Sequence, residues 1–326
     1  FFLLSHVLVE RPFMLATALA TTLTLSVTMK NQALVFLKPH AANDACDAFL
    51  KQHLEQAGIT VTSSGIKRAA EIDEQKLIDQ HYGSLADLAM GVQPGDMAVS
   101  PAALQAFEDA YGLKWAQALP SMLRNDDALA QLGVDGLGLE AMWRAGKQLK
   151  LAPGTYVSRL EGPSPPVYTV NGFYPAMRQA FVAPGAEVRY LVCEWDQALL
   201  SWAAFRQAVI GATDPAKAAA GSARAAMLGQ WRELGLEAKP SMSLNCVHAS
   251  AGPLEGLKER CVWSGASLAS DPLAEALLAG GVGRATLETW LKENSVVSLG
   301  DAKADKVFDL TEEMGAAECV ALCCGA

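Results

Sequence analysis

The chain has 326 residues, of which 51% are hydrophobic and 19% are charged. This composition indicates a globular protein and excludes disorder over most of the chain, and the length suits one large domain or one domain with sizeable additions. The formal net charge of -9 disfavours binding to nucleic-acid backbones, and the chain has no basic patch with interleaved aromatic residues. We therefore predict no nucleic-acid partner, although a few well-placed cations can still bind the phosphates of a small ligand.

The first 28 residues differ from the rest of the chain. They open with FFLLSHVLVE, and Met14 begins an apolar run that is too short to span a membrane. We expect residues 1–28 to be a leader or an incomplete targeting segment, and the globular pattern to start near Met29. Seven cysteines without the spacing of a disulfide framework indicate reduced thiols. The sequence therefore predicts a cytoplasmic protein without a membrane span.

From residue 31 to 90 the pattern predicts strand, helix, strand and helix, at 33–37, 43–58, 59–66 and 71–83. The first strand is a short apolar run that ends at Lys38. Asn43 or Asp44 would cap the first helix, and Asp73 would cap the second.

The segment from residue 91 to 169 has a different character. Ser100 and Pro101 open a helix that Gly112 closes, and two shorter helices are predicted at 126–132 and 138–148. A strand-like stretch and a proline-rich stretch then lead back to the first pattern. We expect an inserted, mainly helical subdomain.

After the insertion the pattern predicts a helix, a strand, a helix, a strand and a helix, at 171–182, 188–195, 201–211, 243–248 and from Ser250 onward. Ser201 would cap the second of these helices, and Ser250 the third. With the insertion removed, the whole forms an α/β (α+β) sandwich with helices packed on a small sheet. Residues 264–326 are predicted to form a helical C-terminal extension and tail.

The common phosphate-binding motifs are missing. The chain contains no glycine-rich loop of the G-x-x-x-x-G-K-[ST] type, no G-x-G-x-x-G after a strand, and no protein-kinase signature. It also lacks H-E-x-x-H and paired Cys/His clusters, so we predict no metal bound by protein ligands alone. If this protein handles nucleotides, it must bind them with side chains.

His248, in the stretch SLNCVHAS, is the candidate nucleophile. It ends a predicted strand, and Glu259 lies eleven residues further on, along the next predicted helix. A nucleophilic histidine needs one ring nitrogen unprotonated, while the other donates its proton to an acceptor that fixes the tautomer. Ser250 could cap the helix and steady the ring. Taken alone, a histidine in such a place is more commonly a satisfied core residue.

Five segments together resemble the nucleoside diphosphate kinase family. In order they are ALVFLKPH, the HY of DQHYGSL, NGFYPAMR, GATDPAKAAAGSAR and NCVHAS with its downstream glutamate. The resemblance covers residues 31–90 and 170–263, and it implies a ferredoxin-like nucleoside diphosphate kinase domain divided by the 91–169 insertion. It also implies transfer of the terminal phosphoryl group of an NTP to an NDP by a ping-pong route.

The resemblance implies a catalytic set of five residues. His248 would be phosphorylated by the donor triphosphate, and Glu259 would orient it. Ser250 would steady the ring and Tyr82 would help to position the phosphohistidine. Lys38 would meet phosphate and sugar hydroxyl groups. Magnesium would be carried by the nucleotide phosphates rather than by a protein site.

The resemblance also implies a nucleotide site that shares Lys38. Thr213 and Arg224 would bind the phosphates and Asn245 the sugar, and Tyr174 would lie against the base. Arginine provides a forked clamp for phosphate oxygens, and an aromatic face stacks on any base. Structural alternatives remain open for each: Lys38 could be a solvated strand end, Arg224 a surface residue, Thr213 part of a turn and Tyr174 a core residue.

Several positions depart from the family pattern. Gln207 stands where a second phosphate-binding arginine is expected, and the adjacent Arg206 could replace it after a small shift. Ala251 follows the serine where the family has aspartate, and Ala220 and Ala225 alter the loop around the arginine. These departures support an alternative, in which the chain is a weak or inactive family member that acts as a nucleotide-sensing or assembly module. The insertion or tail could then bind a protein partner, and homo-oligomers are an implied possibility.

Overall fold

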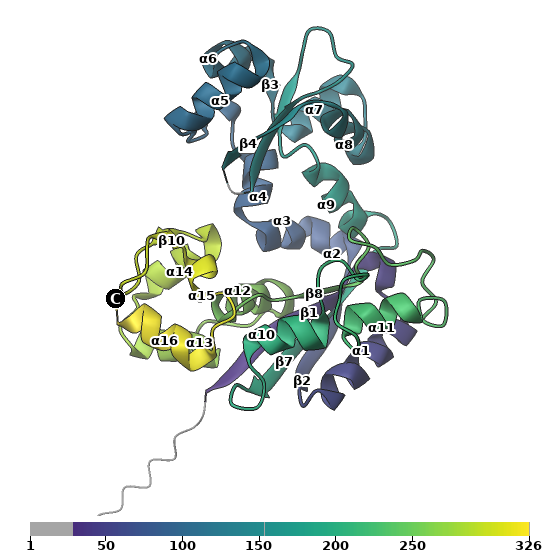
Figure 1. The fold of residues 1–326 in the computed structure, drawn as a ribbon, viewed down its shortest axis with the longest axis vertical. Helices are drawn as coiled ribbons and strands as arrows, with labels where there is room; N and C mark the ends of the chain where they lie inside the picture. Colours follow the sequence, from purple (N-terminus) through teal and green to yellow (C-terminus); the bar gives the residue numbers. More distant parts are fainter. Residues whose placement is uncertain (1–28, 153, 326) are drawn as a thin grey trace, which may run out of the picture.

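The computed structural model describes residues 29–152 and 154–325. They form two four-stranded sheets, helices that cover them, and a helical C-terminal part (Figure 1). This mixed content agrees with the predicted α+β class. The expected leader, residues 1–28, lies outside the described residues.

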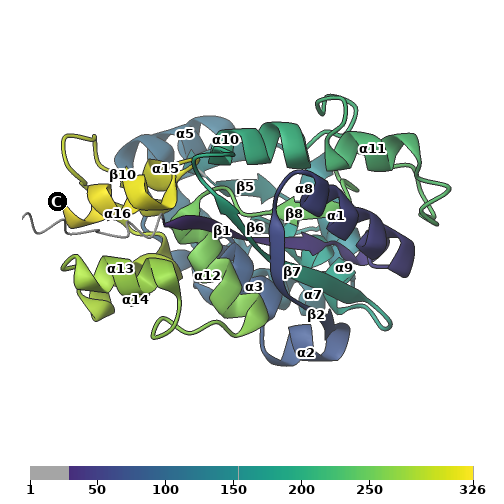
Figure 2. The ribbon, with the colours of Figure 1, turned by 90° about the horizontal axis from the view of Figure 1, so that it is seen from below.

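The main sheet is antiparallel, with strand order β2-β7-β1-β8. Its strands are β1 (Lys30–Leu37), β2 (Thr60–Arg68), β7 (Glu187–Asp196) and β8 (Val247–Ala249). All four strands that the pattern predicted here pair in one sheet, and β8 is shorter than expected. The central strand β1 is buried on both faces, because helices cover both sides of the sheet (Figure 2).

Alternate residues of β1 point into two different cores. Val35 and Leu37 face a core shared with the first group of helices: α1 (Asp44–Gln56), α10 (Trp202–Ala204) with its π-helical continuation η5 (Phe205–Ile210), and α11 (Ala223–Gly229). Leu34 and Phe36 face a core shared with the second group: α2 (Ala69–Glu74), α3 (Leu77–Tyr82), α9 (Tyr174–Val182) and α12 (Pro253–Ser264). Because β8 pairs with β1, successive side chains of β8 also point alternately toward the first and the second group of helices.

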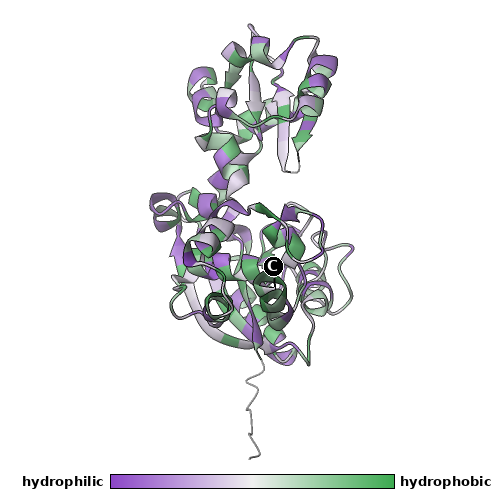
Figure 3. Cartoon of the chain, turned by 90° about the vertical axis from the view of Figure 1, so that its left-hand side faces the viewer, coloured by the Kyte–Doolittle hydropathy of each residue, from purple (hydrophilic) through white to green (hydrophobic). Residues whose placement is uncertain are grey.

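Between α3 and α9 the chain builds a second unit, which lies at the far end of the molecule in Figures 1 and 3. Short helical turns lead into it: α4 (Ser84–Ala86), η2 (Asp87–Gly91) and η3 (Pro94–Asp96). Its helices are α5 (Pro101–Tyr111), α6 (Trp115–Ala118) with η4 (Leu119–Ser121), α7 (Asn125–Leu132) and α8 (Gly136–Ala145). Hydrophobic and hydrophilic residues are mixed along the helices of both units in Figure 3, as expected for helices with one buried side.

The second unit also contains its own sheet, of order β3-β6-β5-β4. The strands are β3 (Met122–Leu123), β4 (Gln148–Ala152), β5 (Thr155–Arg159) and β6 (Tyr168–Val170). The prediction of a mainly helical insertion therefore missed a sheet. Its strands have two to five residues, too few to give a strong alternating pattern.

The C-terminal part packs on α12. It contains α13 (Pro272–Ala279), α14 (Arg284–Glu293), the two-stranded pair β9 (Val296–Val297) and β10 (Asp305–Lys306), α15 (Val307–Thr311) and α16 (Ala316–Cys324). Leu254 and Leu257 of α12 share a core with these helices. All seven cysteines are free thiols, and no helix in the described part of the chain is long and apolar enough to cross a membrane.

Two helix starts differ from prediction. The predicted helix 71–83 is two helices, because Lys76 adopts a left-handed conformation with φ of 54° between α2 and α3, and Asp73 lies inside α2 rather than at a cap. The helix after β8 begins at Pro253 with Gly252 as its N-cap, so Ser250 does not cap it. Asn43, Ser100 and Ser201 do cap their helices as predicted.

Candidate active site

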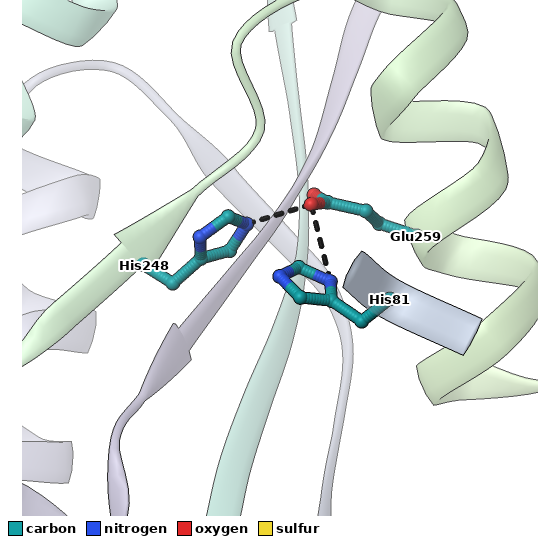
Figure 4. A group of neighbouring side chains, drawn as sticks. All are labelled: His81, His248 and Glu259. Carbon is teal, nitrogen blue, oxygen red and sulfur yellow. Dashed lines mark hydrogen bonds and ion pairs between the residues drawn. The ribbon is translucent and has the colours of Figure 1, made fainter. Parts of the chain in front are cut away.

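His248 is held between a strand and a helix. Its backbone pairs with Phe36 in the sheet, and its ring stacks on the Phe36 ring with centroids 4.6 Å apart. This register places the imidazole on the face covered by α12, where its Nε2 lies 2.8 Å from Oε1 of Glu259 (Figure 4). The structure therefore brings together the two residues that sequence spacing had paired, with the histidine side chain 22% exposed.

Glu259 is buried and has a second hydrogen-bond partner. Ser250 Oγ donates to Oε2 of Glu259 over 2.6 Å, and the same Oγ accepts from the backbone N–H of Leu34 over 2.9 Å. Burial raises the pKa of Glu259, while the hydrogen bond from Ser250 opposes that shift. Ser250 thus fixes the carboxylate that contacts His248, instead of capping the helix.

His81, at the end of α3, completes this group and was not among the predicted site residues. Its Nδ1 lies 3.3 Å from Oε1 of Glu259, and the Trp263 indole N–H donates to the same Nδ1 over 3.3 Å. Its ring meets the His248 ring edge to face, with centroids 4.6 Å apart. The sequence signal was the HY pair at residues 81 and 82, in which only the tyrosine received a role.

Both histidines are neutral at neutral pH. Burial lowers the pKa of His248 to about 3 and the pKa of His81 to about 3. In a neutral imidazole only one nitrogen carries a proton, and a carboxylate next to Nε2 favours that proton on Nε2. Nδ1 of His248 then keeps its lone pair, which is the state a nucleophile requires.

A cavity of about 570 Å³ opens beside His248. Its charged residues are four cations and one acid: Lys38, Arg206, Lys217, Arg224 and Glu313. Its other polar lining residues include Gln207, Thr213, Asn245 and His248. A concentration of cations around a neutral histidine suits a ligand that carries several negative charges.

Lys38 and Arg224 stand close to His248 on the sheet side of this cavity. Burial, and then the neighbouring Arg224 charge, lowers the pKa of Lys38 to about 8. Arg224 donates from Nη1 to the carbonyl of Gly211 over 2.6 Å and from Nη2 to that of Val247 over 2.7 Å. Its buried Nε has no partner among the described residues. Within residues 29–152 and 154–325 neither cation has an acidic partner, so both positive charges are available to a bound anion.

Asn245 and Thr213 lie together on the same cavity wall. Asn245 donates from Nδ2 to the backbone carbonyl of Thr213 over 3.2 Å. The side chain of Asn245 is buried, and its Oδ1 has no hydrogen-bond partner in the part of the chain that the structure describes. An unpaired buried acceptor in a cavity wall suits a donor such as a hydroxyl group on a ligand.

Arg206 also lines the cavity, although its guanidinium is engaged. Its Nη1 lies 2.6 Å from Oε1 of Glu312 and 2.9 Å from Oε1 of Glu313. Both acids belong to the turn between α15 and α16, in the C-terminal part. No pattern in the sequence indicated this contact.

The structure does not place Tyr174, the predicted base contact, beside the cavity. Tyr174 is 0% exposed and does not line the cavity. Its hydroxyl donates to Oδ1 of Asp79 over 2.5 Å, a carboxylate that Arg178 also binds. These polar contacts hold the ring in the core beside Tyr82, 6.2 Å away between ring centroids. The core alternative for Tyr174 is the one observed.

Tyr82 lies behind the histidines rather than in the cavity lining. Burial, and then the Glu259 charge, raises the pKa of Tyr82 to about 12. Its ring meets the His81 ring edge to face, with centroids 4.9 Å apart. Tyr82 can therefore reach His248 only through His81 in this conformation.

His81, His248 and Glu259 form a potential metal-ligand set, with donor atoms within 4.8 Å of one another. Two imidazoles and a carboxylate suit a transition metal rather than magnesium. In the structure Oε1 of Glu259 accepts from His248 and lies near His81, Oε2 accepts from Ser250, and Trp263 donates to Nδ1 of His81. This pattern of contacts gives each group a partner in the protein itself.

No protein-family model and no curated protein matches the chain. Solved structures with some similarity to this chain include two nucleoside diphosphate kinases and one protein of that family. The enzyme from Encephalitozoon cuniculi gives a TM-score of 0.34 at 13% identity, over 72% of this chain and 90% of that chain. The NDP kinase from Pyrobaculum aerophilum gives a TM-score of 0.34 at 16% identity, over 72% of this chain and 96% of that chain. A nucleoside diphosphate kinase family protein from Babesia bovis gives a TM-score of 0.33 at 12% identity, over 72% of this chain and 87% of that chain. These values describe a distant similarity.

Proposed function

We propose that this protein is a nucleoside diphosphate kinase that works through a phosphohistidine at His248. The observation that carries the proposal is the contact between Nε2 of His248 and Oε1 of Glu259 at the edge of a cation-lined cavity. The contact leaves Nδ1 as the nucleophilic nitrogen, and the cavity suits a polyphosphate.

In the proposed first step, Nδ1 of His248 attacks the terminal phosphorus of an NTP. The bond from that phosphorus to the bridging oxygen breaks, and an NDP leaves with the bonding electrons. Positive charge spreads over the imidazole as the new bond forms, and the buried Glu259 stabilises that charge through Nε2–H. A different NDP then attacks the phosphohistidine through its terminal oxygen, which returns His248 to its neutral form.

The cavity residues have distinct roles in this proposal. Arg224 and Lys38 bind phosphate oxygens beside His248, and Arg206 binds others once Glu313 releases it, while Glu312 stays paired with Arg206. Asn245 receives a sugar hydroxyl at its unpaired Oδ1, and Thr213 lies in the same wall. The base lies against backbone and small side chains, since no aromatic ring of the described residues other than His248 lines the cavity. Base preference should then be weak.

Magnesium fits this site as an ion carried by the nucleotide. Mg²⁺ prefers oxygen ligands and commonly takes one or two carboxylates together with substrate phosphates. The cavity provides one carboxylate, Glu313, among its lining residues. When bound, the ion would neutralise charge on the phosphates, and the protein cations would supply the rest.

We also propose a domain organisation for this function. Residues 29–90 and 170–263 would form a ferredoxin-like catalytic domain, for which the strand order β2-β7-β1-β8 gives support. Residues 91–169 would be an inserted subdomain and 264–326 an extension. Homo-oligomers, a protein partner for the insertion and a cytoplasmic location belong to the same proposal.

The decisive experiment is covalent labelling. Purified protein is incubated with Mg²⁺ and ATP labelled on the terminal phosphate. We expect acid-labile, base-stable label on the wild type, discharge of that label by GDP, and no label on His248→Ala. His53→Ala is the matched control, because His53 lies on α1 and contacts the carbonyl of Val209 away from the cavity. Full transfer activity in His248→Ala would contradict the proposal.

A nucleotide sensor without turnover is the second candidate. Two observations favour it: the ring of Tyr174 is buried away from any ligand, and Arg206 is held by Glu312 and Glu313. The same labelling experiment separates the two candidates. A wild-type protein that binds ATP and never becomes labelled would be the sensor.

A further inference from the structure

The C-terminal part places an acid in a cavity whose other charged lining residues, within the described part of the chain, are cations. Glu313 is the only carboxylate among the described lining residues, beside four cations: Lys38, Arg206, Lys217 and Arg224. A carboxylate in this place repels phosphate unless a cation lies between the two. The cavity therefore contains a group whose charge is unfavourable for a bare nucleotide and favourable for a metal–nucleotide complex.

The turn that carries Glu313 is held firmly. The backbone N–H of Glu313 donates to the carbonyl of Ala251 over 3.0 Å. The φ of Glu313 is 59°, a left-handed conformation that glutamate rarely adopts. Gly252 packs so closely on this turn that a Cβ there would lie 2.8 Å from the carbonyl oxygen of Thr311. Surrounding contacts thus maintain an unfavourable backbone conformation, which positions the carboxylate at the cavity.

Arg206 forms ion pairs with two glutamates, although one carboxylate is enough to balance its charge. Nη1 contacts both Glu312 and Glu313, at 2.6 Å and 2.9 Å. Glu312 does not line the cavity, whereas Glu313 does. Glu312 can therefore stay with Arg206 when a phosphate arrives, while Glu313 turns to another cation.

We propose that Glu313 is the residue through which the protein contacts the Mg²⁺ of the bound nucleotide, directly or through one metal-bound water. This inference rests on the nucleotide site proposed above. It goes further in assigning the C-terminal extension a part in that site, through a carboxylate oxygen of the kind that Mg²⁺ prefers. Ala251, whose carbonyl holds the turn, stands where the family resemblance expects an aspartate, so a carboxylate is supplied here from a distant segment.

The test measures the coupling between Mg²⁺ and ADP. Calorimetry gives the Kd of ADP with and without Mg²⁺ for the wild type, Glu313→Gln and Glu312→Gln. We expect the factor by which Mg²⁺ improves ADP binding to fall about tenfold in Glu313→Gln, within the usual range of such couplings. Glu312→Gln is the matched control, because it removes the same charge from Arg206 outside the cavity lining, and it should keep the wild-type factor.

A second readout uses Mn²⁺ in place of Mg²⁺. The electron paramagnetic resonance spectrum of the Mn²⁺–ADP complex should change on binding to the wild type and to Glu312→Gln, and should change less with Glu313→Gln. Thermal unfolding of each variant shows whether it is folded at the temperature of the measurement.

The outcomes separate this inference from the kinase proposal. If Glu313→Gln tightens ADP binding equally with and without Mg²⁺, Glu313 merely competes with phosphate and the inference is wrong. If ADP binds in neither condition, both proposals are wrong. If coupling depends on Glu313 but His248 never becomes labelled, the kinase proposal fails and the metal contact stands.

Discussion

The two ends of the cavity are built differently. At the His248 end, the polar groups are largely buried and paired: Glu259 binds His248 and Ser250, and Trp263 binds His81. At the Arg206 end, the partners are side chains with 35% and 43% exposure, supplied by a separate C-terminal segment. The first arrangement is pre-organised, and the second can exchange partners.

This difference matches the requirements of the proposed reaction, in which the nucleophile needs a more precise geometry than the phosphate clamp. A nucleophile must keep one tautomer and one direction, and a buried hydrogen-bonded carboxylate provides both. A phosphate clamp must release its product, and an exposed ion pair of small net stability exchanges easily with a ligand. Changes at the His248 end should therefore affect the chemical step, and changes at the Arg206 end should affect binding.

The largest effect should come from Glu259→Gln. The amide keeps the shape of the side chain and removes the charge that stabilises the imidazole as the phosphoryl group arrives. We expect the rate of phosphohistidine formation to fall on the order of 10² to 10⁴, with little change in ADP affinity. Rapid-quench labelling measures that rate, and calorimetry measures the affinity.

Glu255→Gln is the matched control for this change. Glu255 is half-buried near His248, and its Oε2 accepts from the backbone N–H of Ala251, whereas the carboxylate hydrogen-bonded to the His248 ring is that of Glu259. Burial, and then the Glu259 charge, raises the pKa of Glu255 to about 7, so the residue is partly neutral already. Equal losses of rate in both variants would mean that Glu259 has no special role and that the comparison of the two ends fails.

The His248 end was the more predictable of the two. His248 and Glu259 lie eleven residues apart in one strand-to-helix unit, so local spacing and the family resemblance together indicated their contact. The positions of the four main-sheet strands along the chain also followed from alternation and apolar runs. Ser250 was predicted to cap the helix after β8, but Gly252 is the N-cap of that helix. Ser250 instead donates a hydrogen bond to Glu259.

The Arg206 end and the place of Tyr174 could not be predicted in the same way. Arg206 meets Glu313 across 107 positions, and Tyr174 meets Asp79 across 95, on the other side of the insertion. Such contacts depend on how separate units pack, and no local periodicity encodes that packing. The departure at Gln207 pointed to Arg206, but nothing in the sequence indicated its acidic partners.

A smaller effect should follow from the pKa of Lys38. Its folded value of about 8 lies below the ordinary 10.5, because of burial first and Arg224 second. The lysine loses its charge as pH rises through about 8, so ADP affinity should fall about tenfold between pH 7 and 9.5, the cost of one charge-assisted hydrogen bond. Calorimetry across that range measures it.

Whereas ADP affinity should fall as pH rises, the contribution of Lys38 to the free energy of unfolding should increase over part of the same pH range. Between about pH 8 and 10.5 the unfolded chain holds the Lys38 proton more tightly than the folded one, so this group's contribution to the free energy of unfolding rises with pH. Lys38→Arg keeps its charge and should bind ADP with a flatter pH profile. Identical binding profiles for Lys38→Arg and the wild type would show that Lys38 does not contact the phosphates.

The smallest effect on the ligand should come from Tyr174→Leu. Removing a buried ring, and one partner of Asp79, should lower the free energy of unfolding by about 3 kcal/mol. The ring is 0% exposed and outside the cavity lining, so the Kd of ADP for the folded protein should not change. Urea unfolding and calorimetry below the unfolding temperature measure the two quantities. Loss of a base-stacking contact would instead weaken binding by about 1 to 3 kcal/mol, and such a loss would mean that α9 moves to bring Tyr174 into the site.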